Sequence, residues 1–195
     1  MTQHQTHTTT EHNRYPDVFK TVKSICGSPK SILSFGCSSG EECFTLLEYF
    51  PTVEVILGVD INEEILQQAR SKNQREEIRF ATRPASGELF DLIFAMSVLC
   101  RWPETDNKEH NNIYSFDDFN AAIELLDSHL KDLGILTLYN TNYNFSETTV
   151  YSKYFPAPIQ PLEAIQKEFV RKFDKQGMHF PYKQPIMYVK QQTQQ

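Results

Sequence analysis

The residues best suited to chemistry in this sequence lie in a glycine turn and at an acidic position twenty residues after it. The turn reads Gly36-Cys37-Ser38-Ser39-Gly40 and is followed by Glu41-Glu42. A glycine lets the backbone bend sharply towards a ligand, and the free N–H groups of a following helix face that ligand. Asp60 ends the next apolar run and can accept hydrogen bonds from both hydroxyls of a ribose. These residues predict a site for a nucleoside that also carries a positive charge.

Two other cofactor classes fit this turn poorly. A dinucleotide-binding turn has the pattern GxGxxG, whereas this turn is GxxxG. A phosphate-binding loop has Lys and then Ser or Thr after its last glycine, where this chain has Glu41. Two consecutive carboxylates repel a pyrophosphate and attract an ammonium or sulfonium group. The alternative role for Asp60 is to cap the helix that follows it.

Short apolar runs and amphipathic stretches alternate around the turn. Strands are expected over residues 31–35, 53–59, 78–81, 91–96, 135–139 and 186–190. Helices are expected over 41–50, 63–72, from Ser115 to the glycine at 134, and over 162–169. Such alternation predicts an α/β fold with a parallel sheet and right-handed crossovers.

A family resemblance becomes specific when these motifs are read in order. The segment 32–42, ILSFGCSSGEE, resembles the first motif of class I S-adenosylmethionine-dependent methyltransferases, and is most similar to the GCSSGEE form of the chemotaxis-receptor methyltransferases. Residues 58–61 are similar to the second motif, 90–94 to the fourth strand, and 130–134 to the family's LKPGG. The resemblance covers roughly residues 30–140. It implies a doubly wound, mostly parallel, Rossmann-like sheet of seven strands or slightly fewer, with helices on both faces.

The resemblance also implies a cofactor, S-adenosyl-L-methionine, and a set of residues that bind it. That set is Phe35, Gly36, Cys37, Ser38, Ser39, Gly40, Glu41, Asp60, Ile61, Thr82, Met96, Ser97 and Val98. Within it, Glu41 is expected to hold the methionine ammonium, because Ser34 stands where most of the superfamily has an acidic residue. No catalytic residue is assigned, since methyl transfer from a sulfonium is an in-line displacement that positioning alone can promote.

The methyl acceptor is expected beyond the fourth strand, near residues 96–103. We expect a small-molecule acceptor, with a protein side chain as the alternative. Trp102, the only tryptophan, is expected either to wall this pocket or to pack in the core. The alternative to an enzyme is a non-catalytic module that binds S-adenosylmethionine or S-adenosylhomocysteine, or that serves as an interaction domain.

Composition limits the remaining possibilities. A chain of 195 residues suits one domain, and its net charge of −6 argues against nucleic acid as a partner. The four cysteines form no CxxC pair, so no metal site is expected. No apolar run approaches the ~20 residues of a membrane span, so we expect a cytoplasmic monomer or dimer. Polar residues 1–13 and 191–195 are expected to be disordered tails around a single methyltransferase domain over 14–190.

Overall fold

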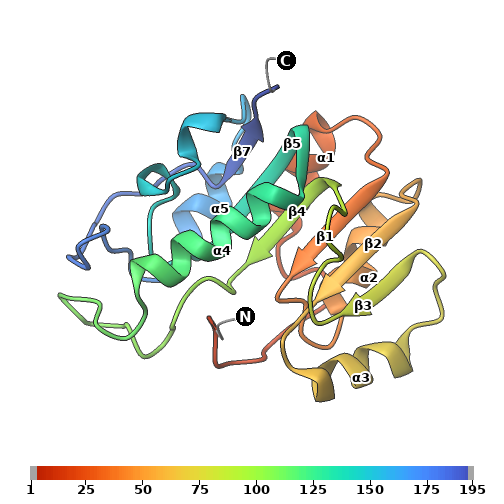
Figure 1. The fold of residues 1–195 in the computed structure, drawn as a ribbon, viewed down its shortest axis with the longest axis horizontal. Helices are drawn as coiled ribbons and strands as arrows, with labels where there is room; N and C mark the ends of the chain where they lie inside the picture. Colours follow the sequence, from red (N-terminus) through yellow and green to blue (C-terminus); the bar gives the residue numbers. More distant parts are fainter. Residues whose placement is uncertain (1–3, 193–195) are drawn as a thin grey trace.

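The computed structural model describes residues 4–192, which form a seven-stranded sheet with helices on both faces (Figure 1). The strand order is β3-β2-β1-β4-β5-β7-β6. The strands are β1 (Ser31–Phe35), β2 (Val55–Val59), β3 (Ile78–Ala81), β4 (Phe90–Met96), β5 (Leu130–Tyr139), β6 (Tyr154–Pro156) and β7 (Met187–Lys190). The first five run parallel, whereas β7 is antiparallel to both β5 and β6. The predicted doubly wound, mostly parallel α/β sheet is confirmed.

Five α-helices cover the sheet. They are α1 (Pro16–Ile25), α2 (Glu41–Tyr49), α3 (Glu63–Lys72), α4 (Phe116–His129) and α5 (Leu162–Lys167). In Figure 1, α4 lies on one face of the sheet and α1 and α2 lie on the other. Side chains alternate along each strand, so Ile32 packs with the cluster of α1 and α2 while Leu33 packs with that of α4. Because both faces are covered, the central strands are mainly apolar.

Side-chain caps fix where α3 and α4 begin. Asn62 Oδ1 accepts the backbone N–H groups of Glu64 and Ile65 at 3.1 and 3.3 Å and starts α3. Ser115 Oγ accepts the N–H of Asp118 at 3.0 Å and starts α4. These caps satisfy N–H groups that have no partner within the helix. They place the first turns of α3 and α4 at the carboxyl edge of the sheet.

The structure differs from the sequence prediction after α4. The helix ends at His129, not at Gly134, and β5 already begins at Leu130, which pairs with Phe90. Leu130 already has extended dihedral angles (φ −96°, ψ 129°), which end the helix, and the backbone of the strand is irregular at Leu133, where φ is 63°. The sequence patterns also left α1 and the short edge strand β6 unassigned.

The N-terminal segment, predicted as a disordered tail, lies beside the sheet in this structure. Residues 4–13 run past the carboxyl ends of the strands, and His4 alone among them is buried. Residues 1–3 and, in the predicted C-terminal tail, 193–195 lie outside the described residues. In residues 4–192 no helix has the length and apolar character to cross a membrane.

Asp91 joins the amino ends of three strands. Its carboxylate accepts the N–H groups of Lys30 and Ser31, both at 2.8 Å, and pairs with Lys131 Nζ at 2.8 Å. Although partial burial opposes ionisation, Lys131 and these N–H groups hold the pKa of Asp91 below its usual value.

We predict that Asp91→Ala lowers the free energy of unfolding by about 1–3 kcal/mol, because it leaves those donors without their acceptor. Urea denaturation at pH 7 measures this change. Glu54→Ala removes an exposed carboxylate from a surface ion pair with Lys30, and it should change stability by less than about 0.5 kcal/mol. Equal effects of the two substitutions would contradict this role of Asp91.

Candidate functional site

A hollow opens at the carboxyl ends of β1, β2 and β4, and we call it the strand-end hollow. Its floor is the glycine turn, where the N–H groups of Gly36 and Cys37 both donate to Val59 O, at 2.7 and 2.9 Å. Gly36 has a left-handed φ of 78°, and a Cβ there would lie 2.3 Å from Val98 Cγ2. A residue with a Cβ would be strained at this φ and would collide with the Val98 side chain, which follows β4. The turn is therefore held against the ends of both neighbouring strands.

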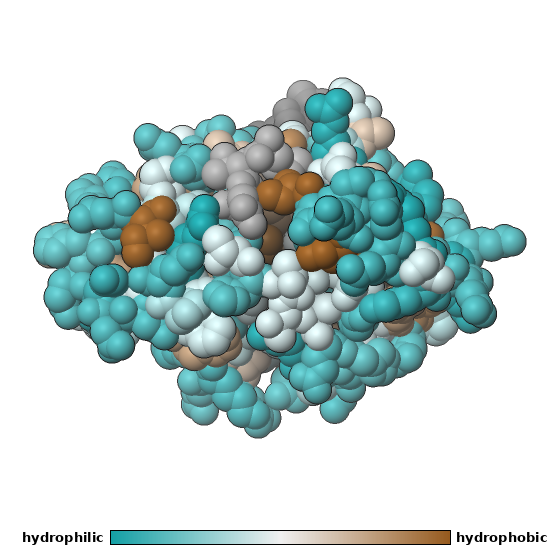
Figure 2. Space-filling view, turned by 90° about the horizontal axis from the view of Figure 1, so that it is seen from below, coloured by the Kyte–Doolittle hydropathy of each residue, from teal (hydrophilic) through white to brown (hydrophobic). Residues whose placement is uncertain are grey.

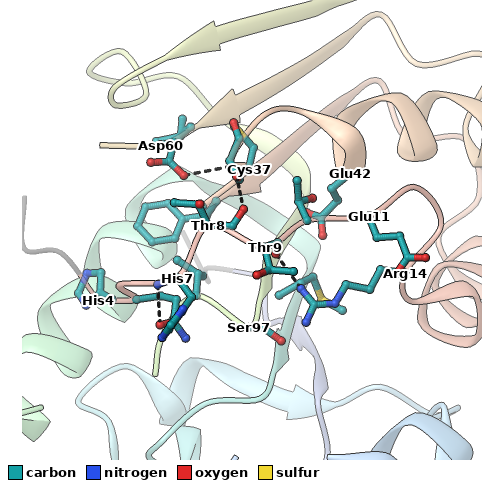
Figure 3. A pocket seen from close by; sticks show the side chains of 18 of the residues that line it. His4, His7, Thr8, Thr9, Glu11, Arg14, Cys37, Glu42, Asp60 and Ser97 are labelled. Atoms are coloured by element: carbon teal, nitrogen blue, oxygen red, sulfur yellow. Dashed lines mark hydrogen bonds between the residues drawn. The ribbon is translucent and has the colours of Figure 1, made fainter. Parts of the chain in front are cut away.

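Asp60 lies at one side of the strand-end hollow (Figure 3). Its Oδ2 accepts the Ser38 N–H at 3.0 Å, and its Oδ1 accepts the Asn62 N–H at 2.9 Å. A carboxylate oxygen has two lone pairs, so each oxygen can still accept one more donor. The backbone thus orients Asp60 and leaves it able to bind two hydroxyl groups.

Glu42 supplies the second carboxylate of the strand-end hollow. It projects from the first turn of α2 and accepts a hydrogen bond from Ser34 Oγ at 2.7 Å. Burial raises the pKa of Glu42 to about 7, against the opposing effects of Ser34 and of the nearby Arg14 guanidinium. A buried carboxylate without a close cation is costly, so this position favours a ligand that brings a positive charge.

Arg14 and Tyr15 complete this side of the strand-end hollow from the N-terminal end of α1. Arg14 Nη1 donates to Thr9 O at 2.9 Å. The hydroxyls of Tyr15 and Ser97 are 2.8 Å apart, and Asn140 Nδ2 donates to Ser97 Oγ at 3.0 Å. Burial raises the pKa of Tyr15, so its hydroxyl stays protonated at neutral pH and is available as a donor.

Most of the residues predicted from the sequence come together here. Those that line the strand-end hollow are Phe35, Gly36, Cys37, Ser38, Asp60, Ile61, Met96, Ser97 and Val98. Ser39, Gly40, Glu41 and Thr82 are not among the described residues that line it. Gly40 instead starts α2 with a φ of 91°, and Thr82 follows β3 at the exposed surface.

Glu41 points away from the position predicted for it. Its carboxylate pairs with Lys72 Nζ at 2.7 Å and accepts Ser39 Oγ at 2.7 Å. Although burial opposes ionisation, Lys72 and Ser39 hold the pKa of Glu41 below its usual value. On a helix, consecutive residues point about 100° apart. Only one of the two glutamates can therefore face the hollow, and the structure places Glu42 there.

The sequence motifs do not indicate that Arg14, Tyr15 and the segment before them line the hollow. The available signal was the helix that follows, since Pro16 stands at its first position and Val18, Phe19 and Val22 have helical spacing. A helix beginning at Pro16 and packed on the sheet brings the preceding residues to the strand ends. The strand-end hollow that remains beneath residues 4–11 has a volume of about 100 Å3.

The family of the chain follows from comparison with known proteins. Residues 33–136, just over half of the chain, match the sequence model of a family described as a methyltransferase domain. The chain belongs to this family of methyltransferase domains. Among curated protein sequences no match was found.

Solved structures share the fold at low sequence identity. The plantazolicin methyltransferase BpumL, in complex with a triazolic desmethylPZN analog and SAH, matches with a TM-score of 0.53 and 12% identity, over 92% of this chain and 87% of that one. CalS10, a SAM-bound amino pentose methyltransferase from Micromonospora echinaspora, matches with a TM-score of 0.52 and 18% identity, over 76% and 58%. In another BpumL complex the match spans 63% of this chain but only 44% of the BpumL chain. At these identities the structures support the fold alone.

The pKa of Glu42 leads to a stability prediction. A carboxyl that titrates near 4.5 in the unfolded chain and near 7 in the folded one binds more protons when folded. Folding stability therefore falls as pH rises from about 4.5 to 7 and stays low above that. We predict that Glu42→Gln raises the free energy of unfolding at pH 8 by up to about 3 kcal/mol and has little effect at pH 4.

Urea denaturation of the ligand-free protein at both pH values measures this difference. Glu41→Gln is the matched control, because Glu41 already has Lys72 as its cation. That substitution should give no gain at pH 8. Stabilisation by Glu41→Gln and not by Glu42→Gln would mean that the buried carboxylate has been misassigned.

Proposed function

We propose that the strand-end hollow binds S-adenosylmethionine and that the chain transfers its methyl group to a small-molecule acceptor, with a protein side chain as the alternative. The observation that carries this proposal is that Glu42 and Arg14 line one side of the hollow and Asp60 lines the other. The ammonium and carboxylate of an amino acid match Glu42 and Arg14, and the hydroxyls of a ribose match Asp60.

Glu42 and Arg14 suit the two charges of the cofactor's methionine end. The carboxylate of Glu42 binds the ammonium, and the guanidinium of Arg14 binds the carboxylate through its paired N–H donors. The ammonium also supplies the cation that the buried Glu42 lacks. This assignment replaces Glu41, whose charge is already balanced by Lys72.

Asp60 and the apolar residues beside it suit the nucleoside end. The two carboxylate oxygens of Asp60 accept the ribose hydroxyls, while Ser38 and Asn62 hold the carboxylate in place. Phe35, Ile61 and Val98 line the hollow nearby and offer apolar surface to the base. Thr82 lies outside this wall and is not assigned to the base.

Methyl transfer requires the protein mainly to position the two reactants. The sulfonium supplies an activated methyl group, so the protein must align the acceptor and exclude water. The Tyr15 and Ser97 hydroxyls lie at the carboxyl end of β4, where Asn140 holds Ser97. We assign them to orienting the acceptor or the methionine end, and we assign no general base.

The GCSSGEE turn resembles that of the chemotaxis-receptor methyltransferases, and we propose that the likeness is limited to cofactor binding. The turn and its two glutamates lie within residues 36–42. The acceptor of those enzymes is therefore not transferred to this chain.

Calorimetric titration with S-adenosylhomocysteine, and with NADH for comparison, tests the cofactor assignment. We expect Asp60→Ala, Glu42→Gln and Gly36→Val each to weaken binding of S-adenosylhomocysteine at least tenfold, or about 1.4 kcal/mol. The first two substitutions remove an acceptor of the ligand, and the third introduces a side chain that collides with Val98. Glu41→Gln should bind almost as tightly as the native chain.

Binding should also depend on pH through Glu42. Since the ammonium requires ionised Glu42, affinity should fall as pH drops below about 7, and Glu42→Gln should remove this dependence. No binding of S-adenosylhomocysteine by folded protein would contradict the proposal. Binding without methyl incorporation into any metabolite or protein acceptor would instead favour a non-catalytic binding module.

A further inference from the structure

We propose that residues 4–13 form a strap that gates the strand-end hollow, with a hinge at Asn13 and a latch at His4. The inference rests on the proposed function, because it concerns how the cofactor reaches the site formed by Asp60 and Glu42. It assigns a role to a polar segment that has no part in the core.

The strap crosses the mouth of the strand-end hollow. In Figure 3, Thr8 and Thr9 lie between Asp60 and Glu42. Ser38 Oγ donates to Thr8 O at 2.8 Å, so the strap is hydrogen-bonded to the glycine turn. The segment from His4 to Glu11 supplies one wall of the hollow.

The space beneath the strap is too small for the cofactor. The strand-end hollow has a volume of about 100 Å3, whereas pockets for ligands of this class have roughly 300–1,000 Å3. Its floor is formed by buried strand ends and a glycine turn that packs against Val98, whereas the strap is the polar, mostly exposed wall. The strap must therefore move outward before a nucleoside of this size can bind.

The strap is held loosely enough to move. Apart from His4, its residues are polar and exposed or half-buried. Its contacts with the rest of the chain include surface hydrogen bonds, such as Thr6 with Glu104 at 3.3 Å and His12 with Glu48 at 3.0 Å. Figure 2, a view turned by 90° from that of Figure 1, shows a mainly hydrophilic face with only scattered hydrophobic groups. A segment with so few buried apolar contacts opens at a small fraction of the cost of global unfolding.

His4 is the one buried residue among residues 4–13 and thus the latch, and Gln5 beside it donates to the buried Cys100 Sγ at 3.2 Å. Its ring lies between those of Phe35 and Tyr114, at centroid distances of 6.4 and 5.5 Å, and Nδ1 is 2.6 Å from the Tyr114 hydroxyl. Burial lowers the pKa of His4 to about 4. The imidazole is therefore neutral at pH 7 and packs uncharged against Phe35 and Tyr114.

Asn13 marks the hinge, because the chain beyond it is fixed. Its backbone has a left-handed φ of 52°, its N–H donates to Thr45 Oγ1 at 2.9 Å, and Tyr49 Oη donates to its side chain at 3.0 Å. These bonds tie Asn13 to α2, and α1 begins at Pro16. Opening also breaks the bond from Arg14 to Thr9 O, which frees the guanidinium for the cofactor's carboxylate. Ligand binding and strap opening are coupled through this residue.

The experiment uses Trp102, the only tryptophan in the chain, as the reporter. The His7 ring lies 6.2 Å from the Trp102 ring, so Trp102 fluorescence reports on the strap. Stopped-flow fluorescence measures the association and dissociation rate constants of S-adenosylhomocysteine, with a radioligand filter assay for variants whose Trp102 signal is lost. We expect a variant lacking residues 2–12 to raise both constants at least tenfold, because the gate is gone.

Single substitutions distinguish the effect of losing the His4 contact from the effect of destabilising the whole fold. Tyr114→Phe removes only the hydroxyl that bonds His4 and should raise both rate constants about threefold. His110→Ala, an exposed histidine in a nearby loop, is the matched control and should leave them unchanged. Amide exchange in the ligand-free native chain should be faster over residues 5–12 than in α1, and still faster in Tyr114→Phe.

The outcomes distinguish this proposal from the one before it. If S-adenosylhomocysteine binds the native chain but the truncated variant has native rate constants, the gate is wrong and the cofactor site stands. Faster dissociation with unchanged association would also overturn the gate, because it describes a wall of the bound site that never obstructs access. Absence of binding by the native chain would contradict the proposed function itself.

Discussion

The site depends on one steric constraint, the close approach of the glycine turn to the end of β4. A Cβ on Gly36 would lie 2.3 Å from Val98 Cγ2. The first two N–H groups of the turn, those of Gly36 and Cys37, both donate to Val59 O. These contacts bring the ends of β1, β2 and β4 together. Asp60, Ser97 and the first turn of α2 then face a common space, because each follows directly from one of those strand ends. The charges of the site are placed by backbone packing before any ligand is present.

The two adjacent glutamates of α2 are held by partners on different elements. The hydroxyl of Ser34 on β1 donates to Glu42 and keeps that carboxylate beside the glycine turn. Its neighbour Glu41 is bound to Lys72 of α3 and helps fix α2 against α3. Two adjacent glutamates thus have separate tasks, one in the site and one in the scaffold.

The sequence predicts the sheet and much of the site because both depend on local signals. Apolar runs define β1 to β4, helical spacing defines α2 and α3, and Gly36 and Asp60 are recognisable from their places at strand ends. The choice between Glu41 and Glu42 depends on the rotation of α2 and on the partner Lys72, which is 31 residues away. The packing of residues 4–13 depends on a seat for His4 formed by Phe35 and Tyr114. Such long-range contacts have no counterpart in local composition, so a polar segment reads as a tail.

The shortness of the two outer strands limits aggregation through the edges of the sheet. One edge is β3, with four residues, and the other is β6, with three, of which the last is Pro156. Unpaired strand edges are templates on which other chains can add strands, and short edges and proline limit this pairing. The seven-stranded sheet thus exposes few unpaired backbone groups with which a strand of another molecule could pair. The protein can keep the carboxyl ends of its inner strands open to a ligand without offering its flanks to aggregation.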